Sequence, residues 1–428
     1  MTAMTIFIGA LVGPMLLGIP IAFALIISGV ALMAYIGMYD VQIVASTLID
    51  GADNYPLMAV AFFILTGELM NAGGISRRII NFAIALFGHI RGGLGYVAVL
   101  SCLLFSGLSG SCVADTAAVA AILIPIMVDC GYNRAMSAAL IASAGIIAPL
   151  MPLSTAFIIF GVTGNVSISK LFVSGIVPSL ILCLCLAGAW YLQTRKMEFK
   201  VFPPVPFKEK VKAFKGAIWA FLLPLIIIVG LRGGIFTPTE GSSVAVFFAL
   251  FVGGVVYREL TLQKLYKALV GAAKTTAIIL FLMAATMVST WMLAVANVPA
   301  AVEQVLSPLL DNKLVLMIVI NILILLVGTA MDSVPTILIF TPILMPIIYK
   351  AGIDPFYFGF MFIFNNMIGV LTPPVGTVLN VAAGVGNVPM NDIIKRVMPY
   401  MCYEIALLFL FTFFPQLVTV PLYFLIGE

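Results

Sequence analysis

Long apolar runs separated by short polar segments dominate this chain. A helix that crosses a membrane needs about 20 mostly apolar residues, while the alternation with a period of two that is typical of membrane-barrel strands is absent from the sequence. Because only helices and closed barrels satisfy their backbone hydrogen bonds in lipid, the pattern predicts an all-α polytopic membrane protein. The apolar runs fall at 4–36, 56–72, 93–130, 134–166, 171–194, 216–231, 241–257, 269–296, 313–349, 355–388 and 397–426.

Composition supports the same conclusion. Hydrophobic residues make up 63% of the 428 residues and charged residues only 9%, whereas a soluble domain carries about 25% charged residues. So few charges cannot cover a protein with polar surface, and we therefore expect a lipid bilayer around it. The formal net charge of +4 indicates no particular partner, and we expect no nucleic acid.

The basic residues cluster and so predict which ends of the helices face the cytoplasm. The linker "RKMEFKVFPPVPFKEKVKAFK" at 195–215 holds seven of the 21 Lys and Arg residues. Its three prolines favour an extended, exposed connector, and the positive-inside rule makes it cytoplasmic. The acidic segment with Asp40, Asp50 and Asp53 fits the outside.

The first apolar run, 4–36, has two interpretations. It forms either one long tilted helix or two short helices around Pro20. The two interpretations give the N-terminus opposite orientations, so the sequence leaves that orientation open.

An internal repeat relates the two halves of the chain. "ILIPIMVDCG" at 122–131 matches "ILMPIIYKAG" at 343–352 at five of ten positions, with a shift of 221 residues. Upstream, Asp115–Pro125 resembles Asp332–Pro342 with a shift of 217. We therefore predict two repeats, 1–194 and 241–428, joined by 195–240, which holds the linker and one connecting span. At the 221-residue shift, Pro152 also falls on Pro373 and Pro178 on Pro399.

The repeats are predicted to be inverted relative to each other. Arg77, Arg78 and Arg91 place the approach to run 93–130 inside, whereas "AAVEQVLSPLLDNK" before run 313–349 is expected outside. One additional span between the repeats, 216–231, would produce the inversion. Inverted repeats around a site at the membrane midplane are the architecture of many secondary transporters.

Two long runs carry a polar interruption at their centre. "SGLSGSCVAD" at 106–115 divides run 93–130, and "VGTAMDS" at 327–333 divides run 313–349. Each run forms either two spanning helices or a re-entrant hairpin. The arm at 93–105 would be only about 20 Å long, against a hydrocarbon core of about 30 Å, which favours re-entrant hairpins.

Prolines break two further runs at positions related by the repeat. Pro149 and Pro152 interrupt 134–166, and Pro373 with Pro374 interrupts 355–388. A break frees carbonyl oxygens that can bind a cation, and the half-helix beyond it presents N–H groups to an anion. We therefore predict two cation sites around one anion site.

The predicted site residues come from the hairpin turns and the breaks. The first cation site combines Ser106, Ser109 and Gly110 with carbonyls near Gly145, Ala148 and Met151. The second combines Gly328 and Met331 with Asn366, Gly369 and Thr372. The residues expected to contact the substrate are Ser111, Ser154, Thr155, Ser333, Thr377 and Asn380.

Other polar residues within apolar runs have two interpretations each. Asp115 and Asp332 follow the hairpin turns and either cap the returning arm, which we favour, or contact an ion or the substrate. Asn365 and Asn366 either bond between helices or act as ligands. Glu68 and Glu404 lie near run ends and are expected to pack at the membrane interface.

Four segments resemble the large membrane subunit of the tripartite ATP-independent periplasmic (TRAP) transporters: "SGLSGSCVADTAAVAAILIPIM", "IIAPLMPLSTAFIIFG", "GTAMDSVPTILIFTPILMPI" and "IGVLTPPVGTVLNVAAG". The resemblance implies an elevator transporter in the bacterial inner membrane, driven by two or more sodium ions at the cation sites. It also implies a small four-helix membrane subunit and a periplasmic substrate-binding protein. That protein delivers an organic acid, of which C4-dicarboxylates, sugar acids and sialic acid are the candidates.

This sequence departs from the family pattern at one place. Leu150 and Met151 separate Pro149 from Pro152, where similar sequences often have paired prolines. The small subunit is expected to be a separate chain, because no four-helix extension precedes residue 4.

The competing functions are less consistent with the sequence. A proton-coupled organic anion permease that works without a binding protein is the main alternative. The sequence has no P-loop for ATP hydrolysis, and it has neither the HExxH nor the GxSxG motif of an intramembrane enzyme. We therefore predict a transporter and not an enzyme.

Overall fold

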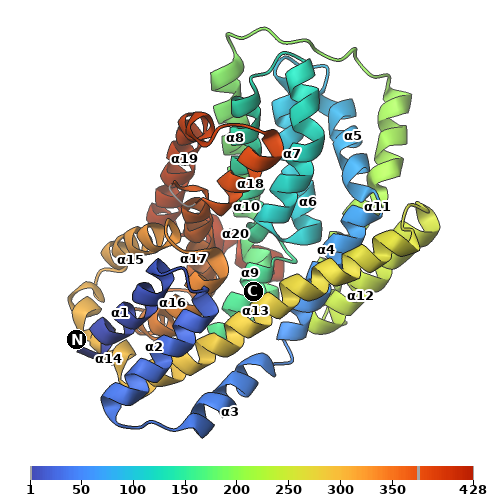
Figure 1. Cartoon of the computed structure of the whole chain (residues 1–428). Helices are drawn as coiled ribbons and strands as arrows, with labels where there is room; N and C mark the ends of the chain where they lie inside the picture. Colours follow the sequence, from blue (N-terminus) through green and yellow to red (C-terminus); the bar gives the residue numbers. More distant parts are fainter. Residues whose placement is uncertain (1, 374–375, 428) are drawn as a thin grey trace.

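The computed structural model describes residues 2–373 and 376–427, and this described part consists of helices and short connections without a β-strand (Figure 1). Short 3₁₀ helices cover Ala148–Leu150 (η1) and Ser307–Leu309 (η3), and a π-helix covers Val252–Val256 (η2). The α-helices of the first half are α1 (Thr2–Leu16), α2 (Ile21–Ile36), α3 (Val41–Ala52), α4 (Leu57–Ala72), α5 (Ile75–Phe87), α6 (Gly93–Ser109), α7 (Cys112–Asp129), α8 (Arg134–Gly145), α9 (Thr155–Thr163) and α10 (Ile168–Thr194).

The second half continues in the same all-helical manner. Its α-helices are α11 (Phe207–Arg232), α12 (Pro238–Phe251), α13 (Leu262–Val295), α14 (Val298–Leu306), α15 (Lys313–Gly328), α16 (Ser333–Lys350), α17 (Pro355–Leu371), α18 (Thr377–Gly386), α19 (Met390–Phe413) and α20 (Gln416–Ile426). The predicted all-α polytopic fold is confirmed.

Several of these helices are long and apolar enough to cross a membrane. In the described part of the chain, six helices meet that criterion alone: α7, α10, α11, α12 with its π-helical end, α13 and α16. Three bent pairs meet it together, namely α3 with α4 at 50°, α8 and η1 with α9 at 44°, and α19 with α20 at 70°. The bend between η1 and α9 lies in the predicted broken run 134–166.

The first apolar run forms two helices, so the alternative of one long tilted helix is wrong. Gly18 has a φ of +84°, a backbone conformation that glycine adopts without strain. Pro20 then stands immediately before α2 and cannot donate a backbone hydrogen bond. The two short helices pack against each other.

The linker is extended over only part of its predicted length. Residues 207–215 are helical, because α11 begins directly after the last proline, Pro206. Lysine and glutamate favour helix there, and Glu209 lies in the positively polarised first turn. The extended part is tied to the helices by backbone hydrogen bonds from Lys200 N to Cys130 O (3.1 Å) and from Phe202 N to Gly88 O (3.1 Å).

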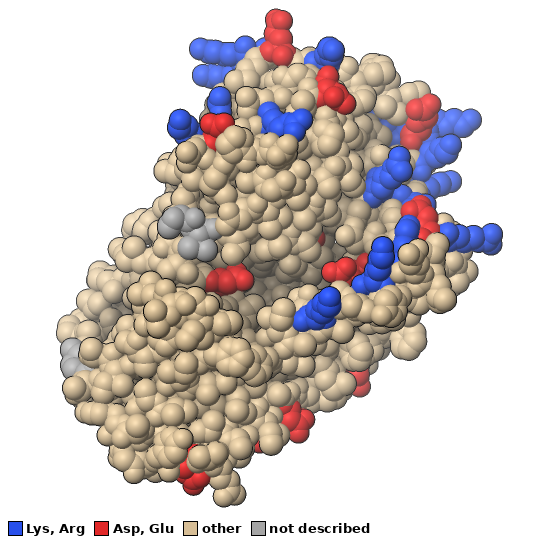
Figure 2. Space-filling view, viewed as in Figure 1, with Lys and Arg blue, Asp and Glu red and all other residues tan. Residues whose placement is uncertain are grey.

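Charge separates along the molecule. In Figure 2 the Lys and Arg side chains gather at the end where the linker between α10 and α11 runs in Figure 1. The opposite end, where α3 lies, carries acidic side chains. Asp40 directly precedes α3 and caps it by accepting a hydrogen bond from the amide of Gln42 at 2.7 Å. The linker and the acidic segment therefore lie at opposite ends, as the positive-inside rule requires if the linker is cytoplasmic.

The two halves interlock around the broken helices. The half-helix α9 packs against α16 and α17, and the half-helix α18 packs against α7 and α8. Around this group, the long helix α13 crosses the molecule (Figure 1) and packs along α2, α3 and α4. Each half thus places its short helix against the hairpin of the other half.

Helix boundaries recur with the offset of the sequence repeat. Helix α7 begins at Cys112 and α16 at Ser333, 221 residues later, and their ends at Asp129 and Lys350 have the same separation. Helices α8 and α17 also begin 221 residues apart, at Arg134 and Pro355. The inversion of the repeats, their division at 194 and 241, and the re-entrant character of the hairpins stay predictions.

Candidate functional site

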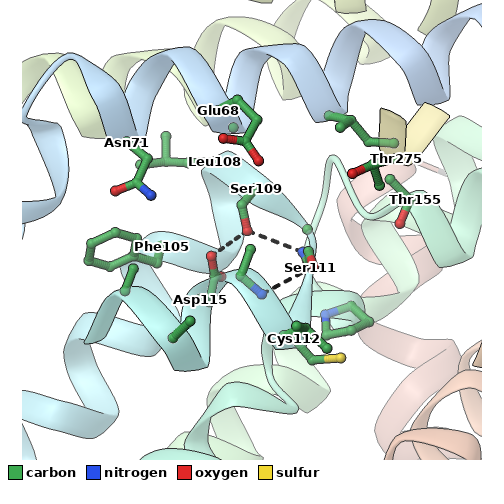
Figure 3. Close-up of a pocket in the computed structure, with 18 of the residues that line it drawn as sticks. Glu68, Asn71, Phe105, Leu108, Ser109, Ser111, Cys112, Asp115, Thr155 and Thr275 are labelled. Atoms are coloured by element: carbon green, nitrogen blue, oxygen red, sulfur yellow. Dashed lines mark hydrogen bonds between the residues drawn. The ribbon is translucent and has the colours of Figure 1, made fainter. Parts of the chain in front are cut away.

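A cavity of about 410 Å³ lies where the two hairpin turns meet (Figure 3). Its wall combines the turn between α6 and α7, the beginning of α16, one face of α4 and α13, and the break before α9. Figure 2 shows a hollow in the middle of the molecular face, with acidic side chains at its edge. The polar residues on the wall include Glu68, Asn71, Ser109, Ser111, Asp115, Thr155, Thr275, Asp332 and Ser333.

The first hairpin turn is built on Gly110. This residue has a φ of +59°, and a Cβ there would lie 2.6 Å from the carbonyl oxygen of Leu153. Only glycine combines that conformation with such a close approach. Ser111 follows in an extended conformation and accepts a hydrogen bond from the amide of Ala114 at 3.4 Å, which caps α7. The turn therefore rests on the break between η1 and α9.

Ser109 and Asp115 form a hydrogen-bonded pair at this turn (Figure 3). The Ser109 hydroxyl donates to Asp115 Oδ1 and accepts from the amide of Ser111 at 3.1 Å. Asp115 is only 1% exposed, and its Oδ2 atom is buried without a hydrogen-bond partner in the described structure. A buried carboxylate oxygen without a partner is costly, so this atom is a candidate cation ligand.

The predicted capping role is right for one aspartate and wrong for the other. Asp332 is exposed and caps α16 through the amide of Ser333 at 2.8 Å. Asp115 does not cap α7, because Ser111 occupies the capping position. Asp115 lies one turn further into the helix, which turns its carboxyl group toward Ser109.

The structure brings most of the first predicted cation site together. A Cβ on Gly145 would lie 1.9 Å from Thr116 Oγ1 and 3.4 Å from the carbonyl oxygen of Cys112, so the end of α8 lies against the start of α7. Ala148 lies in η1, and Met151 follows directly after η1. Two residues further on is Leu153, which contacts Gly110. Ser106 is buried one turn earlier, where its hydroxyl donates to the carbonyl of Leu103. Cation binding by this group stays a prediction.

The second predicted cation site centres on a close helix crossing. A Cβ on Gly369 in α17 would lie 2.6 Å from the Cα atom of Gly328 in α15, and one on Gly328 would lie 3.5 Å from the Asn366 carbonyl oxygen. Thr372 donates from its amide to Gly369 O (2.9 Å) and from its hydroxyl to Ile368 O (2.7 Å). Its hydroxyl oxygen therefore keeps lone pairs for a cation.

Met331 lies in the second hairpin turn, whose backbone closes through a hydrogen bond from Met331 N to Val327 O at 3.0 Å. Pro374, half of the proline pair predicted to break the second helix, lies outside the described residues. Binding of a cation here also stays a prediction.

The two central asparagines differ. Asn365 bonds between helices, because its amide donates to the carbonyl oxygen of Asn321 at 2.7 Å and to its side-chain oxygen at 3.1 Å. Asn366 is 0% exposed, and neither atom of its side-chain amide has a hydrogen-bond partner in the described structure. Of the two, Asn366 remains the candidate ligand.

The predicted substrate residues divide into three groups. Ser111, Thr155 and Ser333 line the cavity. Ser154 is buried, and its hydroxyl caps α9 through the amides of Ala156 (3.2 Å) and Phe157 (3.4 Å). The remaining two residues, Thr377 and Asn380, belong to α18 and are not part of the cavity wall.

The sequence interpretation missed the polar residues of α4 and α13. Glu68 was expected at the membrane interface, but it lines the cavity together with Asn71 and Thr275. A Cβ on Gly271 would lie 3.7 Å from the Glu68 carboxyl carbon, which shows how closely α13 approaches α4. One signal was available: Glu68 and Asn71 are three residues apart and thus share a helix face.

The charge of the cavity is one-sided. Its described wall carries the carboxyl groups of Glu68, Asp115 and Asp332 and no lysine or arginine. Asp115 is buried, whereas Asp332 is exposed. Such a wall attracts cations and repels a free organic anion.

Comparison with known proteins places this arrangement in a family. The family model described as "Tripartite ATP-independent periplasmic transporter, DctM component" matches residues 8–417. The 2,3-diketo-L-gulonate TRAP transporter large permease protein YiaN from Escherichia coli K12 is 49% identical over 98% of this chain and 99% of that protein. The sialic acid TRAP transporter large permease protein SiaM from Vibrio cholerae is 39% identical over 94% of this chain and 95% of that protein.

A solved structure shares the fold. The YdaH transporter from Alcanivorax borkumensis matches with a TM-score of 0.57 at 15% identity, over 89% of this chain and 88% of that one.

The sequence relatives are permease subunits and not enzymes, and the apolar helices make this chain a multi-pass protein of the inner membrane. The resemblance drawn from the sequence motifs is therefore confirmed, and the chain belongs to the DctM component family of the tripartite ATP-independent periplasmic transporters.

Proposed function

We propose that this chain is the translocating subunit of a sodium-coupled importer for an organic acid. The observation that carries the proposal is the cavity at the hairpin turns, where side chains with hydroxyl and carboxyl groups converge. Sodium ions bound at the two turns supply the positive charge that the described wall lacks. The organic acid then binds beside them.

Coupling follows from this charge balance. With Glu68, Asp115 and Asp332 on the wall, a carboxylate substrate entering alone meets repulsion in a poorly screened site. Two or more sodium ions offset that repulsion, so substrate affinity rises with sodium concentration. Because such linkage is reciprocal, substrate also raises the affinity for sodium.

We further propose an elevator movement. The hairpins and half-helices interlock across the two halves, with α9 against α16 and α18 against α7. This interlocked group would move as one body along the surface that α4 and α13 present to it. Glu68 and Thr275 then form the fixed wall of the cavity.

The relatives favour a sugar acid as the substrate. YiaN is named for 2,3-diketo-L-gulonate and SiaM for sialic acid, and both compounds carry a carboxylate on a hydroxylated carbon chain. The proposed partners are a periplasmic binding protein, which delivers the acid, and a small four-helix membrane subunit.

Reconstitution of the three proteins in liposomes tests this function. We expect uptake of a sugar acid that requires an inward sodium gradient and the binding protein. Uptake driven equally well by a proton gradient, with no binding protein present, would instead support the proton-coupled permease. The panel should contain 2,3-diketo-L-gulonate, sialic acid and a C4-dicarboxylate.

A further inference from the structure

A second buried carboxyl group lies away from the cavity. Glu404, which was expected at the membrane interface because it lies near the end of an apolar run, is enclosed by other helices. It lies inside α19 and is 0% exposed. Both of its carboxyl oxygens are buried without a hydrogen-bond partner in the described structure, and the residue is not part of the cavity wall.

Its polar neighbour is a hydroxyl group on another helix. Helix α8 packs along α19, and Ser143 of α8 is the side chain that interacts with the Glu404 carboxyl group. The Ser143 hydroxyl is itself fully buried and has no other hydrogen-bond partner in the described structure. The two groups thus face each other across the contact between α8 and α19.

Charged neighbours do not compensate a carboxylate at this position. Within the described residues, no Lys or Arg side chain forms an ion pair with Glu404. Cys185 of α10 interacts electrostatically with it, but a thiol supplies no positive charge. The other titratable side chains on the helices packed against α19 include Arg134 on α8, Lys170, Cys183 and Tyr191 on α10, Lys313 on α15, Tyr357 on α17 and Tyr423 on α20.

We propose that Glu404 and Ser143 form a proton-binding site between α8 and α19. An isolated carboxylate in an apolar interior is so costly that the group takes up a proton instead. The protonated acid has one O–H donor, and the Ser143 oxygen can accept it. One bound proton therefore removes the buried charge, and the resulting O–H can be paired with the Ser143 oxygen.

A metal cation fits this position less well than a proton. Hard cations such as calcium take 6–8 oxygen ligands, whereas Glu404 and Ser143 together offer three side-chain oxygens without a partner in the described structure. Helix α19 is continuous through Glu404, so its carbonyl oxygens are engaged in helical hydrogen bonds. A proton needs only one donor and one acceptor.

The proton site adjoins the first helix break. Ser143 lies in the last turn of α8, which ends at Gly145 beside the start of α7. Loss of the proton would place an uncompensated charge between α8 and α19, directly behind this break. The site shares no residue with the predicted sodium sites, so it does not depend on the proposed function.

Difference infrared spectroscopy of the full chain in lipid nanodiscs tests the proposal. At neutral pH we expect the carbonyl stretch of a protonated carboxylic acid in the parent protein, and its loss in Glu404→Gln. Asp392→Asn, a change at an exposed position of the same helix, leaves the band in place. A carboxylate band from Glu404, or loss of the acid band when sodium chloride is added, would overturn the proton assignment.

A second pair of variants tests the role of Ser143. Ser143→Ala removes the acceptor and should shift the acid band. Ser137→Ala is the matched control, because the Ser137 hydroxyl on the same helix donates to the carbonyl of Asn133 at 3.1 Å. An acid band at the same frequency in Ser143→Ala and the parent would contradict the shared proton.

Discussion

Replacing Gly369 with alanine tests how closely α15 and α17 approach each other at the second predicted cation site. The added Cβ would lie 2.6 Å from the Cα atom of Gly328, 2.7 Å from its carbonyl carbon and 3.1 Å from its carbonyl oxygen. These are backbone atoms, so no side-chain rotation relieves the overlap. One of the two helices must move.

The expected magnitude is the difference between two effects. Overpacking in a filled interior costs about 1–3 kcal/mol, and alanine is favoured over glycine in a helix by about 1 kcal/mol. The free energy of unfolding should therefore fall by up to about 2 kcal/mol. Because the shift also displaces the Gly369 carbonyl, the sodium concentration for half-maximal uptake should rise.

Gly384→Ala is the matched control. Gly384 also lies in a helix, α18, and a Cβ there would have no atom within 4 Å. The assay is thermal unfolding of each variant in detergent, followed by sodium-dependent uptake in liposomes. We expect Gly369→Ala to unfold at a lower temperature than the parent and Gly384→Ala to unfold at the same or a higher one. Equal unfolding temperatures for the two variants would refute the close crossing.

Three further predictions concern the ions and the topology. Thr372→Val removes a hydroxyl oxygen at nearly constant side-chain shape. Loss of this ligand should cost about 1–3 kcal/mol of sodium-binding free energy and so raise the sodium concentration for half-maximal uptake roughly five- to 150-fold. An unchanged concentration would remove Thr372 from the site. Asp115→Asn removes the buried charge at the first turn and should raise the same quantity at least about tenfold, or 1.4 kcal/mol, whereas Asp392→Asn should not. Single cysteines at Lys208 and Gln304, both exposed, should react with impermeant reagents from opposite faces, and labelling from one face would contradict the inverted repeats.

Much of the fold could be predicted because membrane helices leave a strong signal. Their apolar runs fall close to the observed helices, and the repeat offset read from "ILIPIMVDCG" reappears in the starts of α7 and α16. The linker was less predictable, because prolines up to Pro206 mask the helical preference of the residues that follow. Local composition alone does not show at which residue the extended segment ends and the helix begins.

The candidate site could be predicted only where backbone breaks mark it. Gly110, Ser109 and Thr155 interrupt apolar runs and line the cavity. Glu68 and Thr275 come from α4 and α13, and nothing local indicates that these helices pass the hairpin turns. The burial of Glu404 could not be predicted from its position near the end of an apolar run, because another helix, α8, covers the residue.

Uptake by the reconstituted three-protein system under independently set gradients tests the central claim most directly. A radiolabelled sugar acid is offered together with the binding protein, while the sodium gradient is imposed or abolished and the pH is held equal on both sides. The account predicts accumulation only with the inward sodium gradient, with a Hill slope above one for sodium. Accumulation that persists without any sodium gradient and instead follows an imposed proton gradient would contradict it.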